Sequence, residues 1–150
     1  MIAVIQRVQR AKVTVSDKVV GEIEHGQLLL LGIEYADDDE DIEWLSRKAV
    51  NLRIFDDEGG VMNKSLIDVS GNMLIVSQFT LHASTRKGNR PSYAKAARPE
   101  VAVPLYEKFI SACEQQLGQK VQTGEFGAMM EIDLVNDGPV TIIIDTKDRK

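Results

Sequence analysis

Apolar residues in the first half of the chain either alternate with polar ones or run together, and both patterns predict strands. The predicted strands are residues 2–15, 19–24, 27–35 and 72–79. The first is long, and its polar residues suggest a bulge near Arg10. The continuous run from Leu28 to Leu31 is typical of a strand covered on both faces.

Two other segments show the three- and four-residue spacing of helices. The first opens in an acidic stretch, where Asp38 or Asp39 can cap free N–H groups at the positive end of the helix dipole. Its apolar stripe comprises Ile42, Leu45, Ala49 and Leu52. The second begins at Pro99 and ends at Gly118, and Pro104 either kinks it or marks its true start. Its predicted inner face comprises Val101, Leu105, Phe109, Ala112 and Leu117.

The order of these elements predicts an α+β fold. Strands come first, then a helix, a strand, a second helix and an apolar tail, residues 121–145, that predicts two or three further strands. Short connections favour mostly antiparallel pairing. We expect curved sheets that form a partly closed, barrel-like core with two outer helices. The length of 150 residues suits a single domain spanning residues 1–150.

Composition narrows the classes of function. The net charge of −5 gives no global positive field, so contact with a polyanion requires a local basic patch. The single cysteine, Cys113, excludes an internal disulfide, fits a reducing compartment and is expected in the core. No signal-peptide layout and no apolar run of about 20 residues are present. We therefore expect a cytoplasmic protein without membrane contact.

Polar side chains gather where the strand of residues 72–79 ends. Ser77, Gln78 and Thr80 place hydroxyl and amide groups there, either to line a pocket or to satisfy local backbone groups. A nucleophilic hydroxyl normally needs an adjacent base. His82 would share a face with Thr80 in a strand, although a lone loop histidine is more often simply exposed.

A Gly-Pro pair interrupts the apolar tail. The stretch from Asn136 to Thr141 contains Gly138, which has no Cβ, and Pro139, whose peptide bond can adopt the cis form at modest cost. The pair predicts either a hairpin turn or two main-chain carbonyls aimed into a pocket.

The only dense basic cluster lies in the polar segment of residues 81–97. Arg86, Lys87 and Arg90 are candidate phosphate contacts. Arg7, among apolar residues, pairs with a carboxylate or carbonyls, or extends to solvent. No glycine-rich phosphate loop and no Cys/His cluster with zinc spacing occur, so we expect no cofactor and no metal.

Over essentially its whole length the chain resembles the D-aminoacyl-tRNA deacylase family. The matching segments are residues 1–8, Ser77-Gln78-Phe79-Thr80-Leu81, Pro91-Ser92-Tyr93, Pro104-Leu105-Tyr106 and Asn136-Asp137-Gly138-Pro139-Val140-Thr141. The last of these, together with the Ser77 segment at this separation, is highly specific.

The resemblance implies an obligate homodimer that binds the 3′ acceptor end of aminoacyl-tRNA. It implies that Gly138-Pro139 is cis and enters the partner's active site, where its carbonyls exclude L-amino acids but admit D-residues and glycine. The implied reaction is hydrolysis of the ester of D-aminoacyl-tRNA and glycyl-tRNA(Ala), assisted by the ribose 2′-OH. DNA is not an implied partner.

Roles within the implied site follow residue by residue. Ser77, Gln78, Phe79 and Thr80 form the catalytic group: Thr80 positions rather than attacks, Gln78 anchors the substrate, and Phe79 packs against the terminal adenine or shapes the pocket. The substrate-binding group is Gly138, Pro139, Asn136, Arg7, Arg86 and Lys87, in which Arg7 holds the Gly-Pro turn.

Two other functions fit the residues alone. One is a general esterase that uses Thr80 with His82. The other is a small RNA-binding or scaffold protein in which the basic loop binds and no bond is cut.

Overall fold

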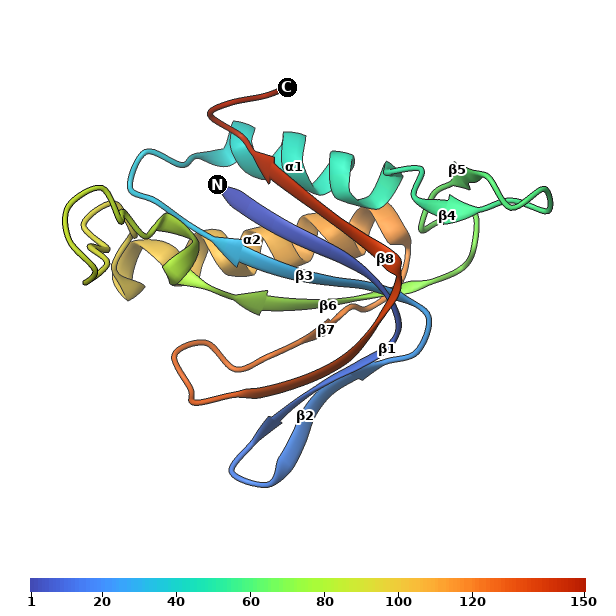
Figure 1. The fold of residues 1–150 in the computed structure, drawn as a ribbon, viewed down its shortest axis with the longest axis horizontal. Coiled ribbons are helices and arrows are strands. Elements are labelled where there is room, and N and C mark those ends of the chain that lie inside the picture. The colour runs from blue at the N-terminus through green and yellow to red at the C-terminus, as the bar shows by residue number, and fades with distance from the viewer.

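The computed structural model describes residues 1–150 and confirms the α+β class (Figure 1). Its elements are β1 (Ile2–Val15), β2 (Lys18–Ile23), β3 (Gly26–Gly32), α1 (Asp39–Asn51), β4 (Phe55–Asp56), β5 (Met62–Lys64), β6 (Asn72–Ser77), η1 (Phe79–His82), α2 (Pro99–Leu117), β7 (Gln122–Thr123) and β8 (Glu131–Asp145). No helix is long and apolar enough to cross a membrane.

Most of the strands form one strongly curved sheet. Its order is β2-β1-β3-β6-β7, and β8 pairs with β1. The pairings of β1 with β2, β3 and β8 are antiparallel, whereas β3–β6 and β6–β7 are parallel. The two end strands of this order, β2 and β7, approach each other: the Glu22 N–H donates to Gln122 Oε1 at 3.4 Å. The predicted barrel-like core with two outer helices is confirmed.

Side-chain alternation divides the apolar residues between two sides of the sheet. The larger cluster includes Ala3 and Ile5 of β1, and both helices contribute to it, α1 through Leu45 and α2 through Phe109. The smaller cluster lies inside the curve and comprises Val8, Ala11, Val13, Ile23, Leu28, Leu74 and Val76. Both helices therefore cover one face of the sheet. The opposite face carries Val4 of β1, Leu30 of β3 and Ile143 of β8 next to the smaller cluster, and this part of it is called here the outer face.

The bounds predicted for both helices are confirmed, since α2 runs from Pro99 to Leu117 with Gly118 as its C-cap, but one side of α2 differs from its prediction. Asp38 caps α1, accepting hydrogen bonds from the N–H groups of Glu40 and Asp41. The predicted inner face of α2 is confirmed in part: Phe109 is buried and Leu105, Ala112 and Leu117 pack against the core, but Val101 is exposed, and the buried residues also include Ala102, Tyr106 and Cys113. The helix also runs from Pro99 through Pro104, so Pro104 is not its start. The buried face includes Tyr106 because its hydroxyl donates to Ile75 O at 2.9 Å, which satisfies its one polar group.

The apolar tail forms only two strands, the short β7 and the long β8, and Gly138-Pro139 does not make a hairpin turn. Asn136 pairs with Val8 and Thr141 pairs with Gln6, so β8 continues along β1 on both sides of the motif. The four residues from Asp137 to Val140 stand opposite Arg7 alone. The motif is therefore a wide bulge within one strand.

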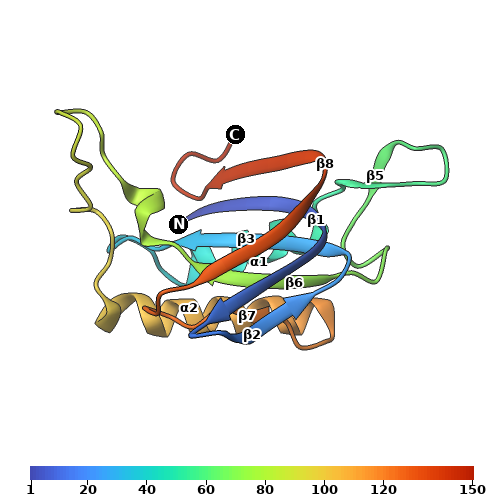
Figure 2. The ribbon, with the colours of Figure 1, turned by 60° about the horizontal axis from the view of Figure 1, so that its bottom comes forward.

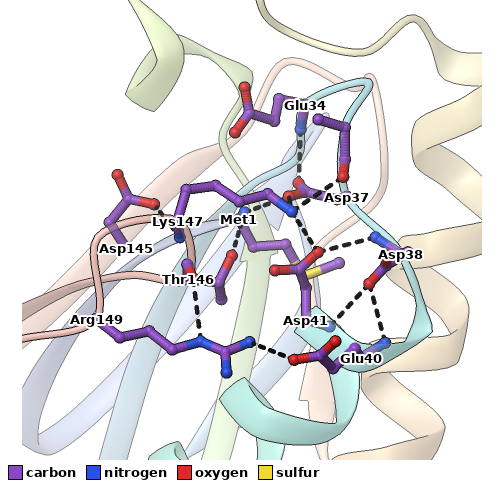
Figure 3. A network of polar contacts seen from close by, with 11 residues as sticks. Met1, Glu34, Asp37, Asp38, Glu40, Asp41, Asp145, Thr146, Lys147 and Arg149 are labelled. Carbon is purple, nitrogen blue, oxygen red and sulfur yellow. Dashed lines mark hydrogen bonds and ion pairs between the residues drawn. The ribbon is translucent and has the colours of Figure 1, made fainter.

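Charged groups join the two ends of the chain to α1 (Figure 3). The Met1 α-amino group is buried against the Asp37 carboxylate and donates to Thr146 Oγ1 at 2.8 Å. Lys147 Nζ lies 2.7 Å from Asp41 Oδ2. Burial alone raises the pKa of Asp41, but the hydrogen bonds it accepts, foremost from Lys147, outweigh burial and hold that pKa well below its usual 3.8.

Candidate functional site

The segment from Ser77 to Thr80 lies where β6 gives way to a short helical turn. β6 ends at Ser77 and η1 begins at Phe79, so the prediction that the strand extends to Phe79 is wrong. η1 packs on Gly32 of β3: a Cβ built there would lie 2.9 Å from Leu81 Cβ and 3.1 Å from His82 Cδ2. The absence of a side chain at Gly32 is what allows η1 to lie against the sheet.

The polar groups of this segment face one another. Gln78 Nε2 donates to Thr80 Oγ1 at 2.5 Å. The first backbone hydrogen bond of the turn runs from Leu81 N–H to Gln78 O at 3.3 Å, which leaves the N–H groups of Phe79 and Thr80 without an acceptor in the chain. The segment thus presents two free amide donors beside a fixed hydroxyl, a combination suited to holding a developing oxyanion.

His82 takes no part in this arrangement. It is only 7% exposed, so its expected placement on an exposed loop is wrong, and its Nε2 has no hydrogen-bond partner. A 3₁₀ turn has three residues per turn, so residues two apart do not share a face as they would in a strand. The structure contains no Thr80–His82 hydrogen bond, and the dyad required by a general esterase is not formed.

An aromatic pair adjoins the free amides. Phe79 and Tyr93 are 53% and 39% exposed, and their rings meet edge to face at a centroid distance of 5.1 Å and an interplanar angle of 74°. Residues 83–98 form an arm that extends beyond the sheet (Figure 2), and Tyr93 directly follows Ser92 of its stem. Ser84 and Ser92 exchange backbone hydrogen bonds of 2.8 and 2.9 Å that close the stem of the arm. Arg86 and Lys87 are exposed on its tip.

The Gly-Pro bulge is exposed and is held from beneath by Arg7. The Gly138-Pro139 bond is cis, and Gly138 has a φ of 144°, in a region that L-residues with a side chain rarely adopt. Arg7 is buried; its Nε donates to Asp137 O at 3.0 Å and its Nη1 to Ile54 O at 2.8 Å. These contacts confirm that Arg7 pairs with carbonyls rather than extending to solvent.

Asn136 fixes the same bulge from the other side. Its Nδ2 donates to Arg7 O at 3.1 Å and to Val140 O at 3.0 Å, so the amide spans the base of the bulge. Arg7 Nε also lies 3.3 Å from Asp137 Oδ2. The bulge is therefore anchored on both strands while Gly138 and Pro139 remain exposed.

One chain does not bring the bulge and the Thr80 segment together. Arg7 pairs with Gln27, and Gln27 with Met73, so Gln78 lies five residues, or about 16 Å, further along the sheet. β8 and β6 are three strand spacings apart, or about 14 Å. The separation within one chain is therefore about 20 Å. Both views place η1 and the bend of β8 at opposite ends of the sheet (Figures 1 and 2).

Comparison with known proteins identifies the family. The family model described as D-Tyr-tRNA(Tyr) deacylase matches residues 4–145. The chain belongs to this family. Proteins named D-aminoacyl-tRNA deacylase from Cytophaga hutchinsonii and Bacteroides fragilis are 60% and 59% identical to it, each over 100% of both chains. The enzyme class predicted from the sequence, a deacylase, is confirmed.

Two solved structures share the fold. A c-Myc DNA unwinding element binding protein superposes with a TM-score of 0.91 at 40% identity, covering 97% of this chain and 98% of that one. A probable eukaryotic D-amino acid tRNA deacylase gives a TM-score of 0.83 at 17% identity, covering 95% and 97%. The second likeness concerns the fold alone.

The sequence missed part of what surrounds the site. Tyr93 was matched only as part of a motif, although an aromatic residue in an otherwise polar loop is itself a signal. Asp137 was likewise matched only as part of a motif, and His25 was missed; His25 Nε2 lies 3.9 Å from Asp137 Oδ2, and the His25 ring meets Phe55 edge to face at 5.2 Å. Cys113 is fully buried, as expected, and burial raises the pKa of its thiol.

Proposed function

We propose that this protein hydrolyses the ester of D-aminoacyl-tRNA, and of glycyl-tRNA(Ala), to free tRNA and amino acid, and that it rejects L-aminoacyl-tRNA. The observation that carries the proposal is membership of the deacylase family over residues 4–145, with full-length relatives of that name. Such editing belongs to translation, so the protein works in the cytoplasm.

The Gly138-Pro139 bulge performs the chiral selection. In a homodimer it enters the partner's site, where its two main-chain carbonyls occupy the space that an L side chain would need. The separation of about 20 Å between the bulge and Gln78 supports a role in trans, because the bulge is too far from the site of its own chain. Anchoring by Arg7 and Asn136 keeps the carbonyls fixed when the substrate arrives.

Two-fold symmetry locates the dimer interface. An axis that exchanges each bulge with the partner's site must pass through the midpoint between them. That midpoint lies over Val4 and Leu30, which pair with each other on the outer face. Beside them, Ile143 pairs with Val4 and is 72% exposed. An exposed apolar group at the centre of this face supports packing of two outer faces against each other.

Catalysis rests on position rather than on an ionisable side chain. Water attacks the ester carbonyl carbon, the bond to the ribose 3′-oxygen breaks, and that oxygen leaves with a proton supplied through the neighbouring 2′-OH. The free N–H groups of Phe79 and Thr80 stabilise the oxyanion, while the Gln78–Thr80 hydrogen bond orients the polar groups of the site. Ser77 ends the strand that carries them.

The basic arm contributes affinity for tRNA. Arg86 and Lys87 are exposed and contact backbone phosphates, which makes binding weaken as salt rises. No base sequence is read by such contacts, so one enzyme can serve many tRNAs.

The decisive experiment compares D-tyrosyl-tRNA, L-tyrosyl-tRNA and glycyl-tRNA(Ala) as substrates of the purified protein without added metal. We expect free tRNA from the first and third and not from the second. Comparable release from L-tyrosyl-tRNA would refute chiral exclusion, and binding without release would favour a purely RNA-binding protein.

A further inference from the structure

The arm of residues 83–98 has the charge of a nucleic-acid contact, in a chain whose net charge is −5. It contains no aspartate or glutamate, and its exposed cations are Arg86, Lys87, Arg90, Lys95 and Arg98. None of their side chains forms an ion pair with the rest of the chain. The arm is therefore complementary to a polyanion that approaches beyond η1.

Three features follow one another outward from the free amides. Phe79 adjoins Thr80 in η1, Tyr93 contacts Phe79, and three cations of the arm, Arg86, Lys87 and Arg90, lie past the Ser84–Ser92 stem. Figure 2 shows the arm extending away from η1. A strand whose 3′ end lies at Thr80 would thus meet an aromatic ring, a second aromatic ring and then positive charge.

The geometry of the two rings suits unpaired bases. In an edge-to-face contact each ring keeps a face free, and both residues are exposed. Their planes lie 74° apart, and a base stacks parallel to the ring that it contacts, so two bases on these rings would not be parallel to each other as they are in a duplex strand. Splayed single-stranded bases that stack on aromatic side chains are the usual targets of sequence-tolerant recognition.

From this order of contacts we propose that Tyr93 stacks on the penultimate base of the unpaired tRNA 3′ end, next to the terminal adenosine at Phe79. The proposal rests on the proposed function, since that function puts the 3′ ester at Thr80. Tyr93 is a substrate-binding residue, distinct from the groups that touch the reacting ester. This role accounts for Tyr93 as the one aromatic residue of the arm.

The test compares two substrates that differ only beyond the terminal nucleoside: D-tyrosyl-tRNA and the D-tyrosyl ester of adenosine. Tyr93→Ala removes the second ring, Tyr93→Phe keeps it, and Met129→Ala truncates a residue that is 92% exposed elsewhere. For Tyr93→Ala we expect KM for the tRNA to rise about fivefold to hundredfold, the range that loss of one stacked base gives, with kcat unchanged. KM for the adenosine ester should not change, and the other two variants should behave as the wild type.

An equal loss on both substrates, or no change on either, overturns the proposal. A direct measurement avoids dependence on turnover: uncharged tRNA carrying 2-aminopurine at the penultimate position is quenched on binding when the base stacks. We expect quenching with the wild type and with Tyr93→Phe, and its loss with Tyr93→Ala at saturating protein. Persistent quenching in Tyr93→Ala would also refute stacking of the penultimate base on Tyr93. Failure of the wild type to hydrolyse either ester would instead refute the proposed function.

Discussion

Replacement of Gly138 by alanine tests the proposed role of the bulge most sharply. A Cβ at this position would lie 2.7 Å from Val140 N and 2.8 Å from Val140 Cγ2, and φ is 144°. A residue with a side chain in this region of φ costs about 1–3 kcal/mol, so the backbone must turn to relieve both contacts. The Gly138 carbonyl moves with it.

The expected effect on stability is modest. At about 2–4 °C per kcal/mol for a chain of this size, Gly138→Ala should lower Tm by about 2–12 °C, which leaves the protein folded at 25 °C. The expected effect on selection is larger. With the carbonyl displaced, hydrolysis of D-tyrosyl-tRNA should fall while the ratio of L- to D-tyrosyl-tRNA hydrolysis rises.

Gly127→Ala is a matched control that separates the effect of backbone strain from the effect of a change at the bulge. Gly127 has a φ of 77° and nothing within 4 Å of a built Cβ, so Gly127→Ala carries backbone strain without steric contact. It should lower Tm but leave the ratio of L- to D-hydrolysis unchanged. If Gly138→Ala keeps both the wild-type rate and the wild-type ratio, or if Gly127→Ala changes the ratio equally, the proposed role of the bulge in selection is refuted.

Three further predictions concern the dimer, the catalytic groups and acid stability. Ile143→Asp should be monomeric by light scattering and should lose most activity at dilute protein concentration, because each subunit would bury a charge in the proposed interface. An active dimer of this variant would show that the outer face is not the dimer interface. Thr80→Ala should reduce kcat only mildly and His82→Gln should leave the pH–rate profile unchanged near neutrality; loss of all turnover in Thr80→Ala would make Thr80 a nucleophile. Since the folded pKa of Asp41 lies below its unfolded value of 3.8, its stabilising effect is complete well above that pH and is lost as the pH falls below about 4. Asp41→Asn should therefore lower the free energy of unfolding at pH 7 and make stability depend less on pH below about 4, as measured by circular dichroism. An unchanged dependence on pH would contradict the ion pair with Lys147.

The separation of the bulge from the Thr80 segment bears on the proposed selectivity of the site. The proposed selection by main-chain carbonyls would need a rigid support, and Arg7 holds the bulge from the strand that pairs with both halves of β8. The catalytic segment needs only free amides and a hydroxyl, which a single short turn supplies. Two simple local structures thus form one site when a second copy is present, under the proposed arrangement.

Much of the fold could be predicted from local pattern. Strands β1, β3 and β6 follow from runs of valine, isoleucine and leucine, and Asp38 was one of two predicted caps of α1, because burial and capping depend on neighbours within a few residues. The motif residues around Thr80 and Gly138 were also found, through their resemblance to a family. The inner face of α2 was predicted in part: Phe109 is buried as expected, but helix spacing alone does not place Val101 outside and Tyr106 inside, and the burial of Tyr106 depends on a distant carbonyl on β6.

The sequence by itself determined the order and type of most elements, the acidic cap of α1 and which residues belong to the family's motifs. Only the tertiary structure decided that Gly138-Pro139 is a bulge rather than a hairpin turn, because pairing with β1, more than a hundred residues away, carries β8 through it. It also placed Phe79 in η1 rather than in the strand, since η1 can pack only where Gly32 leaves room. Both outcomes depend on residues far apart in the chain, whose contact no local pattern encodes.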